Sequence, residues 1–253
     1  MTERKIDESN VAEYQQTKED LKPFLLIWQR NFAPRHKVGC CSELYKRFHP
    51  NSYQEFLEAY NRDGEINQNL DKVHRGRTEF EIIELAKEYK AKCEAQKNVD
   101  YPLETYIKNI YCHVIVETFD GQERERTLAK MLESSGYTVT EVYGDDDAEL
   151  GADLWCEKDD EIFAVQVKPL TFFLGNSNQS LINDRIGAHK KVEKCLKKYG
   201  KKTFYVVYSQ QTNTFLKKKN GKFAFRLEEF CDKQGHTNNF TVQDNILIFK
   251  NFK

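Results

Sequence analysis

The stretch ADLWCEKDDEIFAVQVKP, residues 152–169, decides the fold of the second half of the chain. It contains two runs, 152–158 and 161–169, that are separated by the turn-forming pair Asp159-Asp160. Two short runs of apolar, β-branched and aromatic residues around a two-residue turn are typical of a β-hairpin. The stretch therefore predicts two antiparallel strands.

The sequence on either side extends this hairpin into a mixed sheet. In chain order we expect a helix over 122–136, a strand over 137–144, the hairpin, a helix over 183–200 and a strand over 202–209. The last strand is continuously apolar, as expected when both of its faces are buried. Two further short strands are expected over 223–227 and 246–252. The predicted fold class is therefore α/β, a mixed central sheet flanked by helices.

The first hundred residues predict mainly helices. Apolar residues recur at helical spacing over 20–32, 52–64 and 77–96, and Gly64 is expected to end the second of these helices. The expected buried side of the third helix consists of Phe80, Ile83, Leu85, Ala86 and Tyr89.

The pattern changes after Pro102. A further helix is expected over 105–121, bounded by Gly121. We therefore predict two regions, a mainly helical one over residues 1–100 and an α/β region over 101–253.

Net charge alone does not indicate a nucleic-acid partner, because 39 basic side chains balance 40 acidic ones. The charge is locally uneven, however. The stretch 145–149, DDDAE, is acidic, whereas 190–202 is lysine-rich. A basic surface beside an acidic metal pocket suits an enzyme that acts on phosphodiesters. The lysines of the basic stretch are Lys190, Lys191, Lys194, Lys197, Lys198, Lys201 and Lys202.

The sequence predicts neither a membrane segment nor disulfides. No apolar run approaches the roughly 18 residues that span a bilayer, and the N-terminal MTERKIDESN lacks the apolar stretch of a signal peptide. The seven cysteines show no CxxC spacing, and the Cys40-Cys41 pair has no partner pair to complete a zinc site. We therefore expect reduced thiols, a cytoplasmic location and no membrane partner.

The residues that carry chemistry are Asp153, Gln166 and Lys168. Asp153 opens the first hairpin strand, and Gln166 and Lys168 share one face of the second, whereas Val165 and Val167 face the other way. A hard divalent cation takes oxygen ligands, which a carboxylate and a side-chain amide can supply. A lysine beside them can stabilise the charge that develops on a phosphate during hydrolysis. The pattern predicts a Mg²⁺ site with Asp153 and Gln166 as ligands and Lys168 as a catalytic residue.

This constellation resembles the PD-(D/E)XK nuclease superfamily, with Ala152 in place of the proline and Gln166 in place of the second acid. The resemblance implies a restriction-endonuclease-like core. It also implies a metal-linked glutamate on the helix before the first strand, a position that Glu125 matches and for which Glu123 competes. Asp146 or Glu149 is an alternative neighbour of the metal.

The sequence is also similar to type II restriction endonucleases of the MjaI kind, roughly over residues 77–210. The matching stretches are TYIKNIYCHVIVETFDGQERE (105–125), GADLW (151–155) and VQVKPLTFF (165–173). This similarity implies Mg²⁺-dependent cleavage of double-stranded DNA at a short specific sequence by a homodimer. Region 101–253 would then be the nuclease core, and region 1–100 a DNA-recognition or dimer surface.

Contacts with DNA are expected from three groups of residues. Lys190, Lys194 and Lys197 share a helix face that can neutralise phosphates. Arg77, in a basic loop, and Asn176, in a polar loop, have the side chains that read base edges.

Each assignment has a structural alternative, and the function has two. Asp153, Gln166 and Lys168 could form an ordinary exposed face of the hairpin, and Glu125 could form a surface ion pair. The lysines could form a solvated helix face, and the loops of Arg77 and Asn176 could be simple connections. A structure-selective or repair nuclease of the same fold is the second function considered. A DNA-binding protein without catalytic activity is the third.

Overall fold

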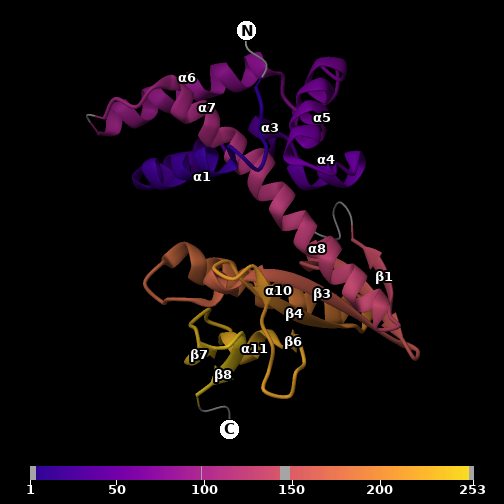
Figure 1. Cartoon of the computed structure of the whole chain (residues 1–253). Helices are drawn as coiled ribbons and strands as arrows, with labels where there is room; N and C mark the ends of the chain where they lie inside the picture. The colour runs from indigo at the N-terminus through magenta and orange to yellow at the C-terminus, as the bar shows by residue number, and fades with distance from the viewer. Residues whose placement is uncertain (1–3, 98, 143–148, 251–253) are drawn as a thin grey trace. The chain divides into compact units, whose positions relative to one another are not determined.

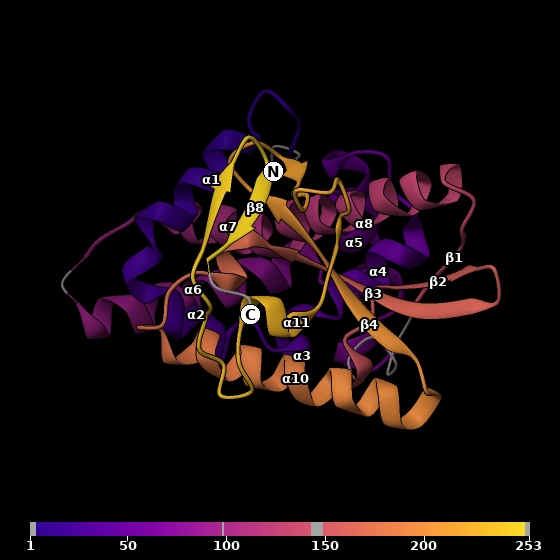
Figure 2. The same cartoon turned by 90° about the horizontal axis from the view of Figure 1, so that it is seen from below.

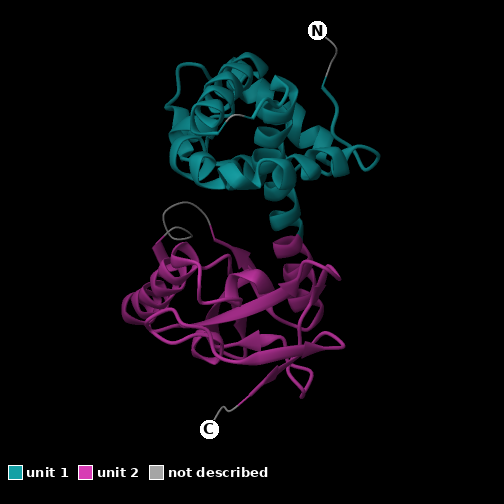
Figure 3. Ribbon diagram, turned by 90° about the vertical axis from the view of Figure 1, so that its left-hand side faces the viewer, with its two compact units in different colours: residues 1–123 teal, residues 124–253 magenta. Residues whose placement is uncertain are grey.

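A computed structural model describes residues 4–97, 99–142 and 149–250. Figure 1 labels its helices and strands. The chain forms two compact units, Met1–Glu123 (unit 1) and Arg124–Lys253 (unit 2), which Figure 3 shows in two colours. The predicted division lay after residue 100. The helical segment 103–123 belongs to unit 1 because Tyr106, Ile110 and Ile115 are fully buried in the helical core.

Unit 1 is built from helices. They are α1 (Val11–Asp20), η1 (Lys22–Phe24), α2 (Leu25–Asn31), α3 (Arg35–Val38), α4 (Cys41–Phe48), α5 (Tyr53–Ile66), η2 (Lys72–His74), α6 (Glu79–Gln96), α7 (Leu103–Tyr111), the π-helical turn η3 (Cys112–Val116) and the start of α8 (Glu117–Ser134). Their apolar faces enclose an aromatic core that includes Phe24, Phe32, Phe56, Tyr60, Tyr89 and Tyr106. Mainly helical structure in this half is therefore confirmed.

Two glycines that were expected to end helices lie inside them. Helix α5 continues past Gly64 to Ile66. A side chain at Gly64 would collide with the backbone carbonyl carbon of Arg77, 2.4 Å from an added methyl, so this glycine permits close packing. Helix α8 likewise runs through Gly121 to Ser134, and the predicted break there is wrong.

The other helix boundaries differ by smaller amounts. The predicted helix over 20–32 is divided, because α1 ends at Asp20 and α2 begins at Leu25 after a 3-10 turn. On α6, Leu85, Ala86 and Tyr89 are buried as predicted. Phe80 was expected inside but is 70% exposed, and Ile82 is fully buried instead. Thr78 caps α6 by a capping box with Glu81.

Unit 2 contains a mixed sheet. Its main strands are β1 (Thr138–Glu141), β2 (Leu154–Lys158), β3 (Glu161–Pro169) and β4 (Lys202–Ser209), in that spatial order, followed by the short β5 (Thr214–Phe215). Strands β1 to β3 are antiparallel neighbours, whereas β4 runs parallel to β3 and is reached through α10 (Gln179–Tyr199). The predicted order α-β-β-β-α-β and the mixed α/β fold class are thereby confirmed.

The hairpin and the last long strand agree closely with the sequence. Asp159 and Asp160 connect β2 and β3 with positive φ angles of 51° and 63°, the conformation that a two-residue hairpin turn requires. Strand β4 covers the predicted residues 202–209, and α10 ends at Gly200 in the left-handed conformation. Residues 143 and 144 of the predicted first strand lie outside the described residues.

The C-terminal segment adds small elements to unit 2. The structure has β6 (Ala224–Phe225) beside β4 and a separate two-stranded sheet of β7 (Phe240–Gln243) and β8 (Ile246–Phe249). Between them lies the short helix α11 (Leu227–Phe230). Strands β6 and β8 fall within the two predicted segments, whereas β5, β7 and α11 were not expected.

Helices α8 and α10 cover opposite faces of the sheet, as Figure 2 shows. Leu128 of α8 packs with Val165 and Val167 in one core cluster. Ala164, on the opposite face of β3, packs with Cys195 of α10 in another. Since side chains alternate along a strand, Gln166 and Lys168 project toward the α10 side.

Candidate active site

Asp153 lies directly before β2, where its carboxylate is tied to the neighbouring strand. Its Oδ2 accepts a hydrogen bond of 2.6 Å from the backbone N–H of Val167, and its own N–H donates to the carbonyl of Val165 at 2.8 Å. The Asp153 carboxylate thus takes the place of a backbone carbonyl as the hydrogen-bond acceptor for β3 at the point where β2 begins. Because Val167 stands between Gln166 and Lys168, this bond brings the carboxylate beside both residues, as the sequence predicted.

Gln166 is buried in the middle of β3, only 5% exposed. Extending the β2–β3 register by one residue places it opposite Asp153. Its side-chain amide takes part in none of the hydrogen bonds found among the described residues, so its oxygen is available to another ligand. A carboxylate and an amide oxygen fit a hard cation such as Mg²⁺, which binds oxygen ligands.

Gly151 forms the floor under Gln166. A methyl group added to Gly151 would lie 3.1 Å from Nε2 of Gln166 and 2.9 Å from Cδ of Lys191 on α10. The residue also has a φ of +59°, which other residues rarely adopt. Glycine at this position lets two side chains from different elements approach the backbone next to Asp153.

Lys168 lies two residues beyond Gln166 on the same face. It is partly buried, and its Nζ lies 5.9 Å from the centre of the Phe172 ring. Within the described part of the chain it forms no ion pair. The ammonium is therefore not committed to a structural carboxylate, as a group that must contact substrate requires.

The predicted acidic partners Glu123 and Glu125 both lie on α8. Glu125 is one turn before Leu128, which packs with Val165 and Val167 of β3. Glu123 accepts a hydrogen bond from the Tyr45 hydroxyl in unit 1.

Of the acids in the 145–149 stretch, Glu149 is the one that lies within the described residues. Glu149 pairs with Lys194 at 2.6 Å, and Asp146 lies outside the described residues. Among residues 4–97, 99–142 and 149–250, no cluster of three Asp, Glu, His or Cys side chains could hold a metal. Glu125 as a metal ligand stays a prediction.

Tyr205 of β4 is a second buried polar group at this place. The parallel register pairs it with Gln166, and its hydroxyl is fully buried without a hydrogen-bond partner in the described structure. Burial, followed by the charges of Cys231 and Asp153, raises the pKa of the phenol above its ordinary value. The hydroxyl therefore remains protonated, as a donor rather than a base.

The lysines predicted to contact DNA are accessible. Lys190, Lys194 and Lys197 are all exposed on α10. Lys194 already pairs with Glu149, so any DNA phosphate would have to compete with that ion pair. Salt bridges between exposed groups contribute only about 0–1 kcal/mol, which makes such an exchange feasible.

The position of Arg77 does not support base reading. It is only 3% exposed, and its guanidinium donates hydrogen bonds to backbone carbonyls from the 35–37 and 72–76 segments. The side chain therefore holds two loops of unit 1 together. With these N–H groups occupied, the predicted contact with a guanine edge is wrong for this conformation.

Asn176 also has a structural partner. Its Oδ1 accepts hydrogen bonds from the N–H and the hydroxyl of Thr237, at 2.7 and 3.0 Å. Nearby, the fully buried Arg185 of α10 donates to the carbonyls of Phe172, Gly175 and Gly235. The polar loop after β3 is thus fastened to the 235–237 turn, and Asn176 retains only its amide N–H groups for another contact.

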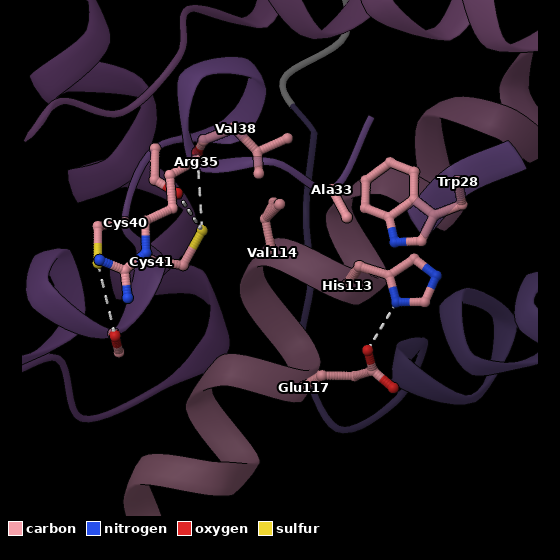
Figure 4. Close-up of a pocket in the computed structure, with 11 residues that line it drawn as sticks. Trp28, Ala33, Arg35, Val38, Cys40, Cys41, His113, Val114 and Glu117 are labelled. Atoms are coloured by element: carbon pink, nitrogen blue, oxygen red, sulfur yellow. Dashed lines mark hydrogen bonds and ion pairs between the residues drawn. The ribbon is translucent and has the colours of Figure 1, made fainter. Parts of the chain in front are cut away.

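Unit 1 contains a pocket of about 280 Å³ that the sequence did not reveal (Figure 4). His113 stacks on Trp28 at 4.7 Å between ring centres, and its Nδ1 lies 2.6 Å from the Glu117 carboxylate. Cys41 also lines the pocket, but burial raises the pKa of its thiol to about 12. The thiol stays protonated at neutral pH, so this pocket does not offer a reactive thiolate beside the histidine.

Two general expectations can be compared with the structure. All seven cysteines are free, in agreement with the predicted reduced thiols. No helix in the described residues has the length and apolar character to cross a bilayer.

The chain matches no protein-family model, and no curated protein matches it significantly. The resemblance to restriction endonucleases therefore remains a prediction from the motif residues.

Proposed function

We propose that the chain is a Mg²⁺-dependent endonuclease that hydrolyses phosphodiester bonds of double-stranded DNA at a short specific sequence, as type II restriction enzymes do. One observation carries the proposal. The Asp153 carboxylate is hydrogen-bonded to the peptide N–H between Gln166 and Lys168, at the start of the hairpin strand in an α-β-β-β-α-β core. The proposal includes a cytoplasmic homodimer.

The chemistry follows from the residues at this point. Asp153 and Gln166 would hold Mg²⁺, and Glu125 is the third ligand that the proposal includes. When bound, the ion supplies Lewis-acid polarisation of the phosphate and an acidified water. The hydrogen bond from Val167 fixes the orientation of the Asp153 carboxylate. Lys168 donates to the phosphate oxygens and stabilises the negative charge that develops on them.

Cleavage of plasmid DNA of known sequence tests the proposal. With Mg²⁺ we expect discrete fragments, and with EDTA none. Lys168→Ala should lower the cleavage rate on the order of 100-fold, as removal of a transition-state donor does. Lys158→Ala is the control, because this lysine lies in the same hairpin but binds the Ser135 carbonyl.

Three outcomes contradict the proposal or redirect it. Full activity of Lys168→Ala removes the assignment of that residue. Cleavage of branched but not linear DNA indicates a structure-selective nuclease. Metal-independent binding without cleavage indicates a DNA-binding protein that lacks catalysis. Sedimentation of the free protein and of its DNA complex tests the homodimer.

A further inference from the structure

Lys191 differs from the other lysines of α10 in the direction that it faces. Ala188 and Cys195 are buried against the sheet, and Lys191 follows the first by three residues and precedes the second by four. It therefore belongs to the stripe of the helix that faces the sheet. Lys191 is partly buried, whereas Lys190 and Lys194 are exposed.

The side chain of Lys191 reaches the residues around Asp153. Its Cδ would lie 2.9 Å from a methyl group added to Gly151, and the amide of Gln166 would lie 3.1 Å from the same methyl. The aliphatic stem of the lysine and the amide of Gln166 therefore both lie against one glycine, two residues before Asp153. A long side chain that buries its stem in this way still extends its ammonium beyond it.

The ammonium of Lys191 has no counter-ion in the described residues, unlike its neighbours on the same helix. Lys194 pairs with Glu149, and Glu193 pairs with Lys233. A partly buried cation without a carboxylate is stabilised when an anion binds beside it. Phosphate is the anion that an ammonium and an adjacent amide N–H can both bind by donating hydrogen bonds.

We propose that Lys191 and Gln166, which both lie against Gly151, form a binding subsite for a phosphate oxyanion. The identification of that phosphate as one of the DNA backbone rests on the proposed function. Lys191 then contacts the substrate directly. It acts as a second ammonium, contributed by the helix, beside the one that Lys168 contributes from the strand.

Cleavage kinetics test the DNA part of this inference. Lys191→Ala should lower kcat at saturating DNA on the order of 100-fold. Lys191→Arg, which retains the charge, should recover most of the rate. Lys130→Ala is the matched control, because it removes one exposed helical lysine from the same unit and should leave the rate unchanged. Equal rates for Lys191→Ala and Lys130→Ala, with an active parent, would overturn the subsite and leave the nuclease assignment standing.

A titration with inorganic phosphate tests the subsite without any cleavage. The Cε–Hε NMR signal of Lys191, identified by its disappearance in Lys191→Arg, should shift on addition of phosphate, whereas that of Lys130 should not. If the parent cleaves no DNA and this signal shifts, the subsite stands and the nuclease assignment fails. If the parent cleaves no DNA and the signal does not respond, the subsite is overturned as well. Circular dichroism of each variant shows whether it is folded.

Discussion

At the scale of single residues, Asp153 has a structural task that can be separated from its proposed catalytic one. Its carboxylate accepts the N–H of Val167, which would otherwise be a buried donor without a partner. An asparagine can still accept this hydrogen bond through its amide oxygen, but it carries no charge for a metal. An alanine can do neither.

We therefore expect Asp153→Ala to lose about 1–3 kcal/mol of unfolding free energy, and Asp153→Asn to lose much less. Both variants should be inactive with Mg²⁺. Urea denaturation and plasmid cleavage measure the two effects independently. If Asp153→Asn cleaves at the parent rate, Asp153 serves the fold alone.

Gln166 gives a second test at this scale, because it stands where the PD-(D/E)XK nucleases that the sequence resembles have their second acid. Gln166→Glu places a carboxylate in a site that is 5% exposed, near the Asp153 carboxylate. Without metal it should lower the unfolding free energy by about 1–3 kcal/mol. Bound Mg²⁺ should offset this decrease, since a ligand stabilises by about 2.7 kcal/mol at a hundredfold excess over its Kd.

Thermal unfolding of Gln166→Glu with and without Mg²⁺ measures the effect. The rise in Tm on adding Mg²⁺ should exceed that of the parent. Gln243→Glu, an exposed position on β7, is the control for the change in charge. An equal Mg²⁺ response in Gln166→Glu and the parent would show that residue 166 is not a ligand.

At the scale of elements, the glycines show what a helical pattern cannot reveal. Gly64 and Gly121 both interrupt apolar periodicity, yet both lie inside helices. The backbone of Arg77 packs against Gly64, whereas nothing lies within 4 Å of a methyl group added to Gly121. The first glycine is required by packing, and the second only lowers helix propensity.

Gly121→Ala should therefore raise the unfolding free energy by about 0.5–1 kcal/mol, the difference in helix propensity. Gly64→Ala, in the same unit, should lower it by more than that, because its methyl group would meet backbone that cannot move aside. Chemical denaturation of both variants checks the pair. A stabilising effect of both would mean that the packing around Gly64 is not tight.

The sequence predicted correctly those elements that are determined by a few neighbouring residues, such as a turn pair or an apolar run. The Asp159-Asp160 turn and the apolar run of β4 needed no knowledge of their neighbours. The faces of helices depended on more distant information. The helical phase changes at the π-helical turn Cys112–Val116, so the side of α8 on which Glu125 lies could not be derived by counting from residue 105.

At the scale of the whole molecule, the exposed lysines of α10 bear on how DNA would be bound. Reversing Lys190, Lys194 and Lys197 to glutamate should weaken binding to all sequences about equally. The dependence of log K on log salt should flatten by about one unit for each DNA phosphate that the variant no longer neutralises.

Salt titrations of binding to cognate and scrambled duplexes measure this effect. Reversal of Lys130, Lys219 and Lys222, three exposed lysines of unit 2 outside α10, makes the same change in net charge and serves as the control. Identical slopes for the two triple variants would move the DNA interface away from α10. The assignment of the catalytic residues would be unaffected.

The sequence anticipated the meeting of Asp153, Gln166 and Lys168, because strand alternation and a short hairpin determine it. It did not separate Lys191 from the other lysines of the basic stretch, because the inward direction of this side chain depends on how α10 packs on the sheet, which no local pattern contains. The sequence analysis assigned Arg77 to DNA because the sequence does not show whether an arginine faces solvent. In the structure, backbone carbonyls accept hydrogen bonds from the N–H groups of Arg77.

The Arg185 side chain has a practical consequence for anyone who redesigns this protein. Its guanidinium joins Phe172, Gly175 and Gly235 at one point, and the Asn176–Thr237 hydrogen bonds reinforce the same junction. Although burial lowers the pKa of this guanidinium, an arginine stays protonated in proteins near neutral pH, so the junction does not depend on a group that titrates there. The loop 171–178 and the turn 232–238 therefore depend on each other for their conformation. A graft that replaces residues 171–178 alone would leave a buried cation facing missing carbonyls, and a successful exchange must transfer the 232–238 turn as part of the same cassette.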